Sequence, residues 1–210
     1  MPELLRANEF SLRQNIYGLA SLKDVPKLKK VIREQGLTYI SDGCECIVAK
    51  RKGNTDKVIA FNYYEFDIVT AKRLIVIQRL LHTIFPHNFP IFHTIYYGNQ
   101  KSKTPGVSIR YEIKTAKDIV NNPHFTTKYP FEKVEKTVKE LGLPVEFDSA
   151  TFNYKIGPDG GEYFLDTPKE IADKEWNQYR TIKYMQNSGY SKVDIDLVSK
   201  SINRLQRLNQ

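Results

Sequence analysis

The sequence predicts an α+β fold in two lobes. Short strand patterns separated by turn signals are concentrated in the first half of the 210-residue chain, around residues 38–64 and 91–113. Helical patterns dominate the second half, after one long helical pattern in the first. Because runs of strands followed by runs of helices are typical of α+β proteins, we expect a β-rich N-terminal lobe with one long helix over residues 1–113 and a helical C-terminal lobe over residues 114–210.

The composition is that of an ordinary globular protein. Apolar residues make up 40% of the chain and charged residues 27%, which is enough to build a core. The longest apolar stretches are far too short to cross a bilayer. The N-terminus lacks the apolar run of a secretory signal. We therefore expect a cytoplasmic protein with no membrane partner.

The first lobe is predicted to begin with a helix and a three-stranded meander. Apolar residues at helical spacing predict a helix over residues 19–35, and Gly36 is its stop signal. Strand patterns follow at residues 38–40, 45–50 and 57–64. Asp-Gly and Gly-Asn pairs lie between them, so we expect tight turns and antiparallel neighbours.

The clearest helical pattern in the chain covers residues 71–85. Thr70 is a suitable N-cap, and Pro86 ends the pattern. Strands are predicted after it at residues 91–97 and 107–113, on either side of a loop that contains Gly and Pro. This pattern completes the N-terminal lobe.

A proline-flanked segment connects this helix to the next strand. Pro86 and Pro90 restrict the backbone, so we expect a rigid connection. Its three phenylalanines, Phe85, Phe89 and Phe92, are expected to enter the core.

The second lobe is predicted to combine helices with one hairpin. An amphipathic helix is expected over residues 131–141. Strands at 154–156 and 162–165 flank a Pro-Asp-Gly-Gly turn, which indicates a β-hairpin. Two further helices are expected over residues 169–187 and 194–208.

The net charge of +8 is compatible with an anionic partner. However, the Lys and Arg residues form only short clusters, at residues 27–30, 50–52 and 101–103. None of these is the longer basic run that is typical of nucleic-acid-binding tails. A basic protein that binds nucleic acid or an acidic partner is therefore an alternative that the sequence does not favour.

Three polar residues near the hairpin suit phosphate chemistry. Phosphoryl transfer from ATP needs oxygen ligands that hold Mg²⁺ against the phosphates, and a carboxylate that orients the attacking hydroxyl. Asp148 and Asn153 precede the predicted hairpin, which returns the chain to Asp166. The segment therefore offers a carboxylate, an amide and a second carboxylate to one site.

The interval from Asp148 to Asn153, the hairpin and Asp166 resemble the catalytic loop and the metal-binding Asp of the protein kinase-like superfamily. Because Asp166 precedes Thr-Pro rather than Phe-Gly, aminoglycoside-phosphotransferase-like small kinases are the more similar members. The resemblance implies a two-lobed protein-kinase-like fold with a reduced helical C-terminal lobe. It also implies ATP and Mg²⁺ as cofactors, with Asp148 as the catalytic base and Asn153 and Asp166 as the metal ligands.

The resemblance further implies a nucleotide-binding set in the first lobe. Residues 41–48, at the place of the family's glycine-rich loop, contain one glycine, Gly43. The strand that carries the phosphate-pairing lysine in the family has no lysine at the matching place. Lys57 at its start and Lys50 on the strand before it are therefore the candidates. Gln78 is the one polar residue near the place of the helical glutamate that pairs with this lysine.

Two alternatives stay open for this segment. The absent lysine and glutamate favour a catalytically inactive scaffold of the pseudokinase type, whereas Asp148 favours an active enzyme with an unknown protein or small-molecule acceptor. Asp166 could also have a structural role, as the N-cap of a helix that begins near Pro168.

Overall fold

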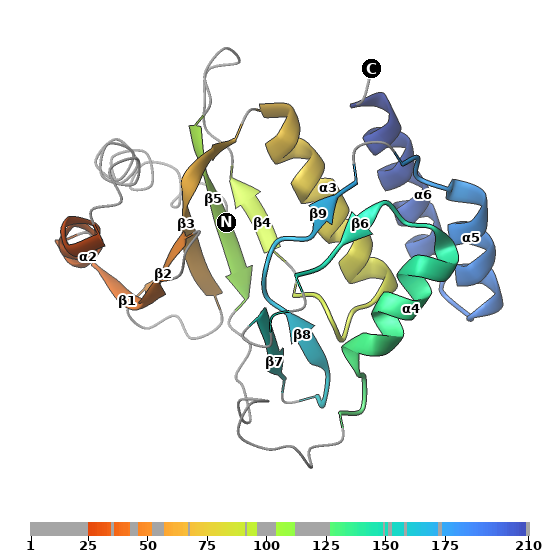
Figure 1. Cartoon of the computed structure of the whole chain (residues 1–210), viewed down its shortest axis with the longest axis horizontal. Helices are drawn as coiled ribbons and strands as arrows, with labels where there is room; N and C mark the ends of the chain where they lie inside the picture. The colour runs from red at the N-terminus through yellow and green to blue at the C-terminus, as the bar shows by residue number, and fades with distance from the viewer. Residues whose placement is uncertain are drawn as a thin grey trace. The chain divides into compact units, whose positions relative to one another are not determined.

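The computed structural model shows two compact units, Met1–Lys72 with Phe92–Glu112, and Arg73–Ile91 with Ile113–Gln210. Helices and small antiparallel sheets occur together (Figure 1), so the predicted α+β class is confirmed. In the described part of the chain, no helix is both long enough and apolar enough to cross a membrane. The structure describes residues 25–34, 36–42, 46–51, 57–66, 68–90, 92–95, 104–111, 127–148, 150, 153–157, 159–171 and 174–208.

The first unit contains helix α2 (Val25–Glu34) and a five-stranded antiparallel sheet in the order β1-β2-β3-β5-β4. The predicted meander of the first three strands is confirmed, and β5 begins before the predicted start at residue 107. The strands are β1 (Leu37–Asp42), β2 (Cys46–Arg51), β3 (Lys57–Phe66), β4 (Phe92–Ile95) and β5 (Thr104–Tyr111).

Helix α2 packs its apolar side against the sheet. Ile32 of the helix is fully buried, as are Ile47 and Ala49 of β2. The Nζ atom of Lys29 lies 4.2 Å from the centre of the Tyr39 ring on β1, in a cation–π contact. Burial of alternate residues on β2 agrees with the two-residue period of a strand that has one covered face.

Helix α3 (Ile68–Ile84) crosses from the first unit to the second. The sequence predicts this helix within the N-terminal lobe, whereas its residues from Arg73 onward pack in the second unit. Apolar side chains on this part of the helix are buried in the core of the second unit, where they pack with α4 and α6. They are Val76, Ile77, Leu80, Leu81 and Ile84.

The second unit combines α3 with three further helices and two small sheets. The predicted hairpin is confirmed as the antiparallel pair β7–β8. A second pair, β6–β9, was not predicted. The elements are α4 (Phe131–Leu141), β6 (Val145–Glu146), β7 (Tyr154–Ile156), β8 (Glu162–Phe164), β9 (Lys169–Glu170), α5 (Gln178–Asn187) and α6 (Lys192–Arg207).

The predicted helix over residues 169–187 is wrong in its first half. Residues Lys169–Glu170 form strand β9, and helix α5 begins only at Gln178. The side chain of Asn177 accepts a hydrogen bond of 2.9 Å from the Arg180 amide and so caps the helix start. Because no helix begins near Pro168, the interpretation of Asp166 as an N-cap is also wrong.

The proline-flanked connection after α3 contributes to an aromatic cluster. Phe85 and Phe89 are buried, as predicted, whereas the side chain of Phe92 lies outside the described residues. The cluster has ring centroids between 4.9 and 6.2 Å apart, spacings at which aromatic rings attract each other. It is formed by Phe89, Phe131, Phe147, Tyr154 and Phe164.

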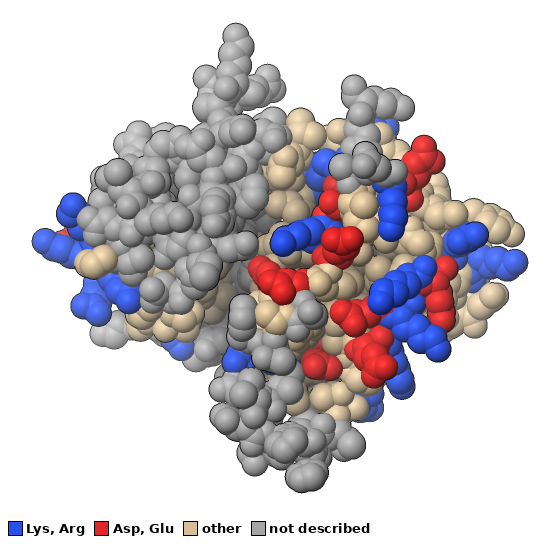
Figure 2. Space-filling model, viewed as in Figure 1, with Lys and Arg blue, Asp and Glu red and all other residues tan. Residues whose placement is uncertain are grey.

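Charges of both signs are mixed on the visible face of the second unit. In Figure 2, Lys and Arg side chains lie next to Asp and Glu side chains over this unit. Helix α4 illustrates the pattern, with Lys136 and Glu140 one turn apart on its surface. The coloured part of this face, which belongs to the described residues, therefore has no extended region of a single charge.

Candidate functional site

The β6–β9 ladder lies between the chain segments that lead to Asp148 and from Asp166. Val145 of β6 pairs with Glu170 of β9, and the next residues pair in antiparallel register. The chain therefore leaves β6 toward Asp148 at the same end where it enters β9 after Asp166. The backbone of Asp148 and that of Asp166 therefore flank the same end of this small sheet, a few residues beyond its paired positions.

Asn153 closes the loop that follows Asp148. Its Nδ2 atom donates a hydrogen bond of 3.3 Å to the main-chain carbonyl of Asp148, and its amide donates one of 2.9 Å to the carbonyl of Ala150. Asn153 is only 8% exposed, whereas Asp148 is exposed. The bond uses the amide nitrogen of Asn153, so Oδ1 is the side-chain atom that can coordinate a cation.

The residue directly before Asp166 in the chain is hydrogen-bonded to Asn153. The amide of Leu165 donates a hydrogen bond of 2.8 Å to the carbonyl of Asn153. The Oδ1 atom of Asp166 accepts one of 2.7 Å from the Thr167 amide, and the residue is half-buried. The structure thus brings Asp148, Asn153 and Asp166 together in one part of the second unit.

The ligand chemistry of these residues suits Mg²⁺. Mg²⁺ is commonly bound by one or two carboxylates that are completed by phosphate and water. The carboxylate of Asp166 and the amide oxygen of Asn153 fit that pattern. Among the residues that the structure describes, no group of three or more His, Cys, Asp or Glu is arranged to hold a metal by itself. The metal roles of Asn153 and Asp166 therefore stay predictions that depend on a phosphate ligand.

Phe147 fixes the backbone directly before Asp148. Its half-buried ring lies 5.1 Å from the Phe131 ring and 5.3 Å from the Phe164 ring, both edge-on. Sequence reasoning did not assign this residue a role. The signal was present in the alternation of the short strand, where Val145 is buried, Glu146 is exposed and Phe147 turns inward again.

Asn88 anchors the hairpin to the connection after α3. Its Nδ2 atom donates to the carbonyls of Tyr129, at 2.9 Å, and Glu162, at 3.0 Å. The main-chain carbonyl of Asn88 accepts a hydrogen bond of 2.9 Å from the Phe164 amide. Asn88 is buried, so these bonds satisfy its side-chain nitrogen and its main-chain carbonyl and fix β8 in place. Sequence reasoning missed it because its partners are distant along the chain.

The tip of the hairpin lies against the same connection. A Cβ atom at Gly161 would be 2.1 Å from the carbonyl oxygen of His87, so only glycine fits. The Nδ1 atom of His87 lies 2.7 Å from Oδ2 of Asp159, and the Tyr163 hydroxyl donates to the same oxygen at 2.9 Å. Burial alone raises the pKa of Asp159, but the hydrogen bonds from His87, Gly161 and Tyr163 outweigh it and lower the pKa.

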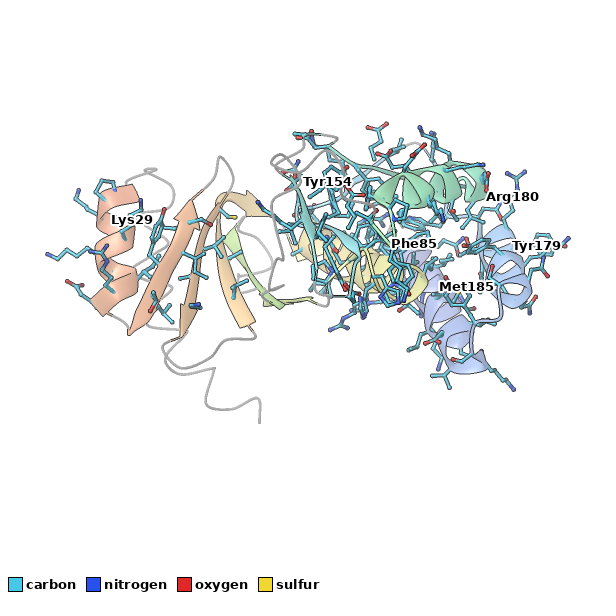
Figure 3. All side chains as sticks on the ribbon, turned by 90° about the horizontal axis from the view of Figure 1, so that it is seen from below. Lys29, Phe85, Tyr154, Tyr179, Arg180 and Met185 are labelled. Atoms are coloured by element: carbon cyan, nitrogen blue, oxygen red, sulfur yellow. The ribbon has the colours of Figure 1, made fainter. Side chains whose placement is uncertain are left out.

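Acidic groups surround Tyr154, which follows Asn153. Burial, together with the negative charges of Glu135, Glu162 and Asp148, raises the pKa of Tyr154 to about 12. Figure 3 shows this residue among the closely packed side chains of the second unit, whereas Tyr179 on α5 extends away from them. The negative charges near Tyr154 favour a cation at the adjacent loop.

The nucleotide-binding candidates belong to the first unit, whereas Asp148, Asn153 and Asp166 belong to the second. Lys50 is half-buried on β2, where it pairs with Thr38 of β1. Lys57 is the first residue of β3 and pairs with Tyr111, and its side chain lies outside the described residues. Gly43 also lies outside the described residues. The nucleotide-binding roles of these three residues therefore stay predictions.

Comparison with known proteins assigns no family to this chain. The functional interpretation therefore depends on the geometry around Asp148, Asn153 and Asp166. No protein-family model matches the chain, and no curated protein sequence matches it.

Proposed function

We propose that the chain is a divergent kinase-like domain that binds ATP with Mg²⁺ and transfers a phosphoryl group to an acceptor hydroxyl. The observation that carries this proposal is the hydrogen bond from Asn153 Nδ2 to the carbonyl of Asp148. It joins the candidate metal ligand to the candidate base. The Leu165 amide, bonded to the carbonyl of Asn153, adds Asp166 to the same constellation.

Each of the three residues has an environment that suits its role. The buried Asn153 is held rigidly and presents Oδ1 as a metal ligand, and the half-buried Asp166 supplies a carboxylate. Asp148 is exposed, so an acceptor hydroxyl can approach its carboxylate and be oriented by it. When bound, Mg²⁺ and ATP supply the charge neutralisation and the phosphoryl group.

Nucleotide binding without transfer is a second candidate function, and Gln78 favours it. This residue on α3 is 3% exposed, and its Oε1 atom is a buried acceptor without a hydrogen-bond partner in the described structure. An amide has no charge with which to pair a phosphate-binding lysine. A site that keeps Mg²⁺ ligands but lacks this ion pair would bind ATP and turn it over slowly or not at all.

The proposal is tested by calorimetric titration of ATP with and without Mg²⁺. We expect Mg²⁺-dependent binding in the parent protein, loss of that binding in Asp166→Ala, and parental binding in Asp196→Ala, which removes an exposed carboxylate on α6. ATP at about 100 times its dissociation constant should also stabilise the fold by about 2.7 kcal/mol. The absence of any binding at millimolar ATP would refute both nucleotide proposals.

The two candidates differ in turnover. Asp148→Asn keeps the hydrogen-bonded shape of the loop and removes the base. If the domain is an enzyme, this variant binds ATP as the parent does but transfers the γ-phosphoryl group to water, forming ADP and phosphate, at least about 100-fold more slowly, the lower end of what a positioned general base contributes. If the domain is a scaffold, parent and variant form ADP at the same negligible rate.

A nucleic-acid partner is distinguished by its salt dependence. Binding through phosphate contacts weakens steeply as salt concentration rises. The mixed charges on the face in Figure 2 do not favour such a surface there. Oligonucleotide binding that follows this salt dependence, with no binding of ATP, would replace the kinase-like proposal.

A further inference from the structure

A buried ion pair connects α3 to strand β9. Arg73 donates from Nε to Oε2 of Glu170 at 2.8 Å, and from Nη2 to Oε1 of the same carboxylate. The pair is therefore bidentate, which is the strongest geometry for these two groups. The Arg73 side chain is 11% exposed and the Glu170 side chain 18%. Charged groups this deeply buried are rare unless they are paired.

Two further elements complete this network. Nη1 of Arg73 donates a hydrogen bond of 2.8 Å to the carbonyl of Leu205, near the end of α6. The indole Nε1 of Trp176 donates one of 2.9 Å to Oε1 of Glu170. Gln206 in turn donates to the carbonyl of Trp176 at 3.3 Å. Glu170 is therefore held by two side chains, those of Arg73 and Trp176, and each of these is bonded in turn to α6.

Glu170 belongs to the ladder whose two strands connect to Asp148 and to Asp166 along the chain. It pairs with Val145 of β6, the strand that leads to Asp148, and it follows Asp166 along the chain. The amide of the next residue, Ile171, donates a hydrogen bond of 2.8 Å to the Pro144 carbonyl and extends the pairing. The network is therefore fixed to the ladder that leads into the site.

We propose that Arg73, Glu170 and Trp176 are positioning residues that hold Asp166 and Asp148 in the geometry needed for Mg²⁺ and phosphate. This inference deepens the proposed function and rests on it. None of the three side chains is a ligand candidate, so they act through the β6–β9 ladder. Groups that orient metal ligands from outside typically change metal affinity by about 10- to 100-fold when they are removed.

A purely structural role of the network would have a different signature. It would lower the melting temperature and leave the site of the folded protein unchanged. Ile202→Ala supplies this reference, because Ile202 lies fully buried on α6 without a role in the ladder. Glu170→Gln and Arg73→Lys are the test variants, because each keeps most of the side-chain volume. Trp176→Phe removes only one hydrogen-bond donor, so it is the variant that perturbs the fold least.

The experiment compares local order and binding at a temperature where every variant is folded. Hydrogen exchange of the Leu165 and Thr167 amides reports the segment around Asp166, since these amides donate to Asn153 and to Asp166. Calorimetry with ATP and Mg²⁺ reports the site. We expect exchange at both amides to be at least about tenfold faster in Glu170→Gln and Arg73→Lys, and affinity to be about 10- to 100-fold weaker. Trp176→Phe should show a smaller change of the same kind.

The outcomes separate the two proposals. Unchanged exchange at Leu165 and Thr167 in Glu170→Gln and Arg73→Lys, with melting temperatures lowered as in Ile202→Ala, would overturn the positioning role. If the exchange rises but the parent protein does not bind ATP with Mg²⁺, positioning of the segment is supported and the proposed function fails. Equal loss of affinity in Ile202→Ala would also overturn the inference, because it would attribute the loss to general destabilisation.

Discussion

The side-chain amide of Asn153 donates a hydrogen bond to the main-chain carbonyl of Asp148, across 3.3 Å. This bond joins the buried side chain of Asn153 to the main chain of the exposed Asp148. The position of Asn153 therefore limits the position of the Asp148 backbone. The proposed chemistry depends on this hydrogen bond more than on any other feature of the described residues.

We predict that Asn153→Ala lowers both stability and ligand affinity. The substitution removes the bond to Asp148 and the proposed metal ligand Oδ1. Because the side chain is buried and its hydrogen bond is neutral, the free energy of unfolding should fall by about 1 kcal/mol. ATP binding with Mg²⁺ should weaken at least about tenfold. Urea unfolding and calorimetry measure these effects, and Asn203→Ala on the exposed face of α6 is the matched control. Full affinity in Asn153→Ala would exclude this residue as a ligand.

Phe147 should stabilise the loop before Asp148 through its aromatic contacts. Phe147→Ala removes the edge-on contacts with Phe131 and Phe164. Because the ring is only half-buried, we expect a loss of about 2 kcal/mol in the free energy of unfolding, below the range for a fully buried phenylalanine. Phe147→Leu keeps the apolar bulk and should lose about half as much. An alanine variant as stable as the parent would show that the cluster does not hold this loop.

Gly161 should tolerate no side chain. In Gly161→Ala the new Cβ atom meets the backbone oxygen of His87, which cannot turn aside as a side chain would. We expect a loss of about 2–3 kcal/mol, as for other overpacked sites. Gly189→Ala is the comparison, because it has open space and a φ of +76° and should lose roughly 1–2 kcal/mol through backbone strain alone. Thermal unfolding measures both, and equal losses would contradict the close approach at Gly161.

The hairpin tip should make stability depend on pH in the acidic range. The pKa of Asp159 is lowered in the folded state, so its contribution is fully present above the unfolded value of about 3.9. It is lost as the pH falls from there through the lower folded-state pKa. Because the side chain is about one-third exposed, a contribution of roughly 0.2–1 kcal/mol is expected. Unfolding of the parent and Asp159→Asn should therefore differ at pH 5 and converge toward pH 2. A constant difference across this range would contradict the lowered pKa.

The sequence predicted the elements whose signals are local. Helix α4 and strand β7 have the predicted bounds, because apolar spacing and turn residues define them over short windows. Strand β9 could not be predicted, since its two residues are ordered by pairing with β6. The same limit explains the wrong start of α5, whose helical pattern extends into a segment that pairs as a strand.

The candidate site was predictable only in part. Asp148, Asn153 and Asp166 are close in sequence, so their spacing indicates a common site. The groups that hold these three residues in place are far apart in the sequence. Arg73 and Glu170 are 97 residues apart, and neither has a local pattern that predicts a partner. Asn88 anchors the hairpin through carbonyls far along the chain, which no periodicity of side chains can reveal.

The most direct test of the central claim is to locate the metal with Mn²⁺ in place of Mg²⁺. Nuclear magnetic resonance spectra of the protein with ATP would be recorded as Mn²⁺ is added, since this paramagnetic ion broadens signals of nearby nuclei. The kinase-like account predicts that the amide signals of Asn153 and Thr167 broaden first, while that of Ile202 on α6 is unaffected. Broadening centred elsewhere, such as on α2, or none in the presence of ATP, would contradict the account.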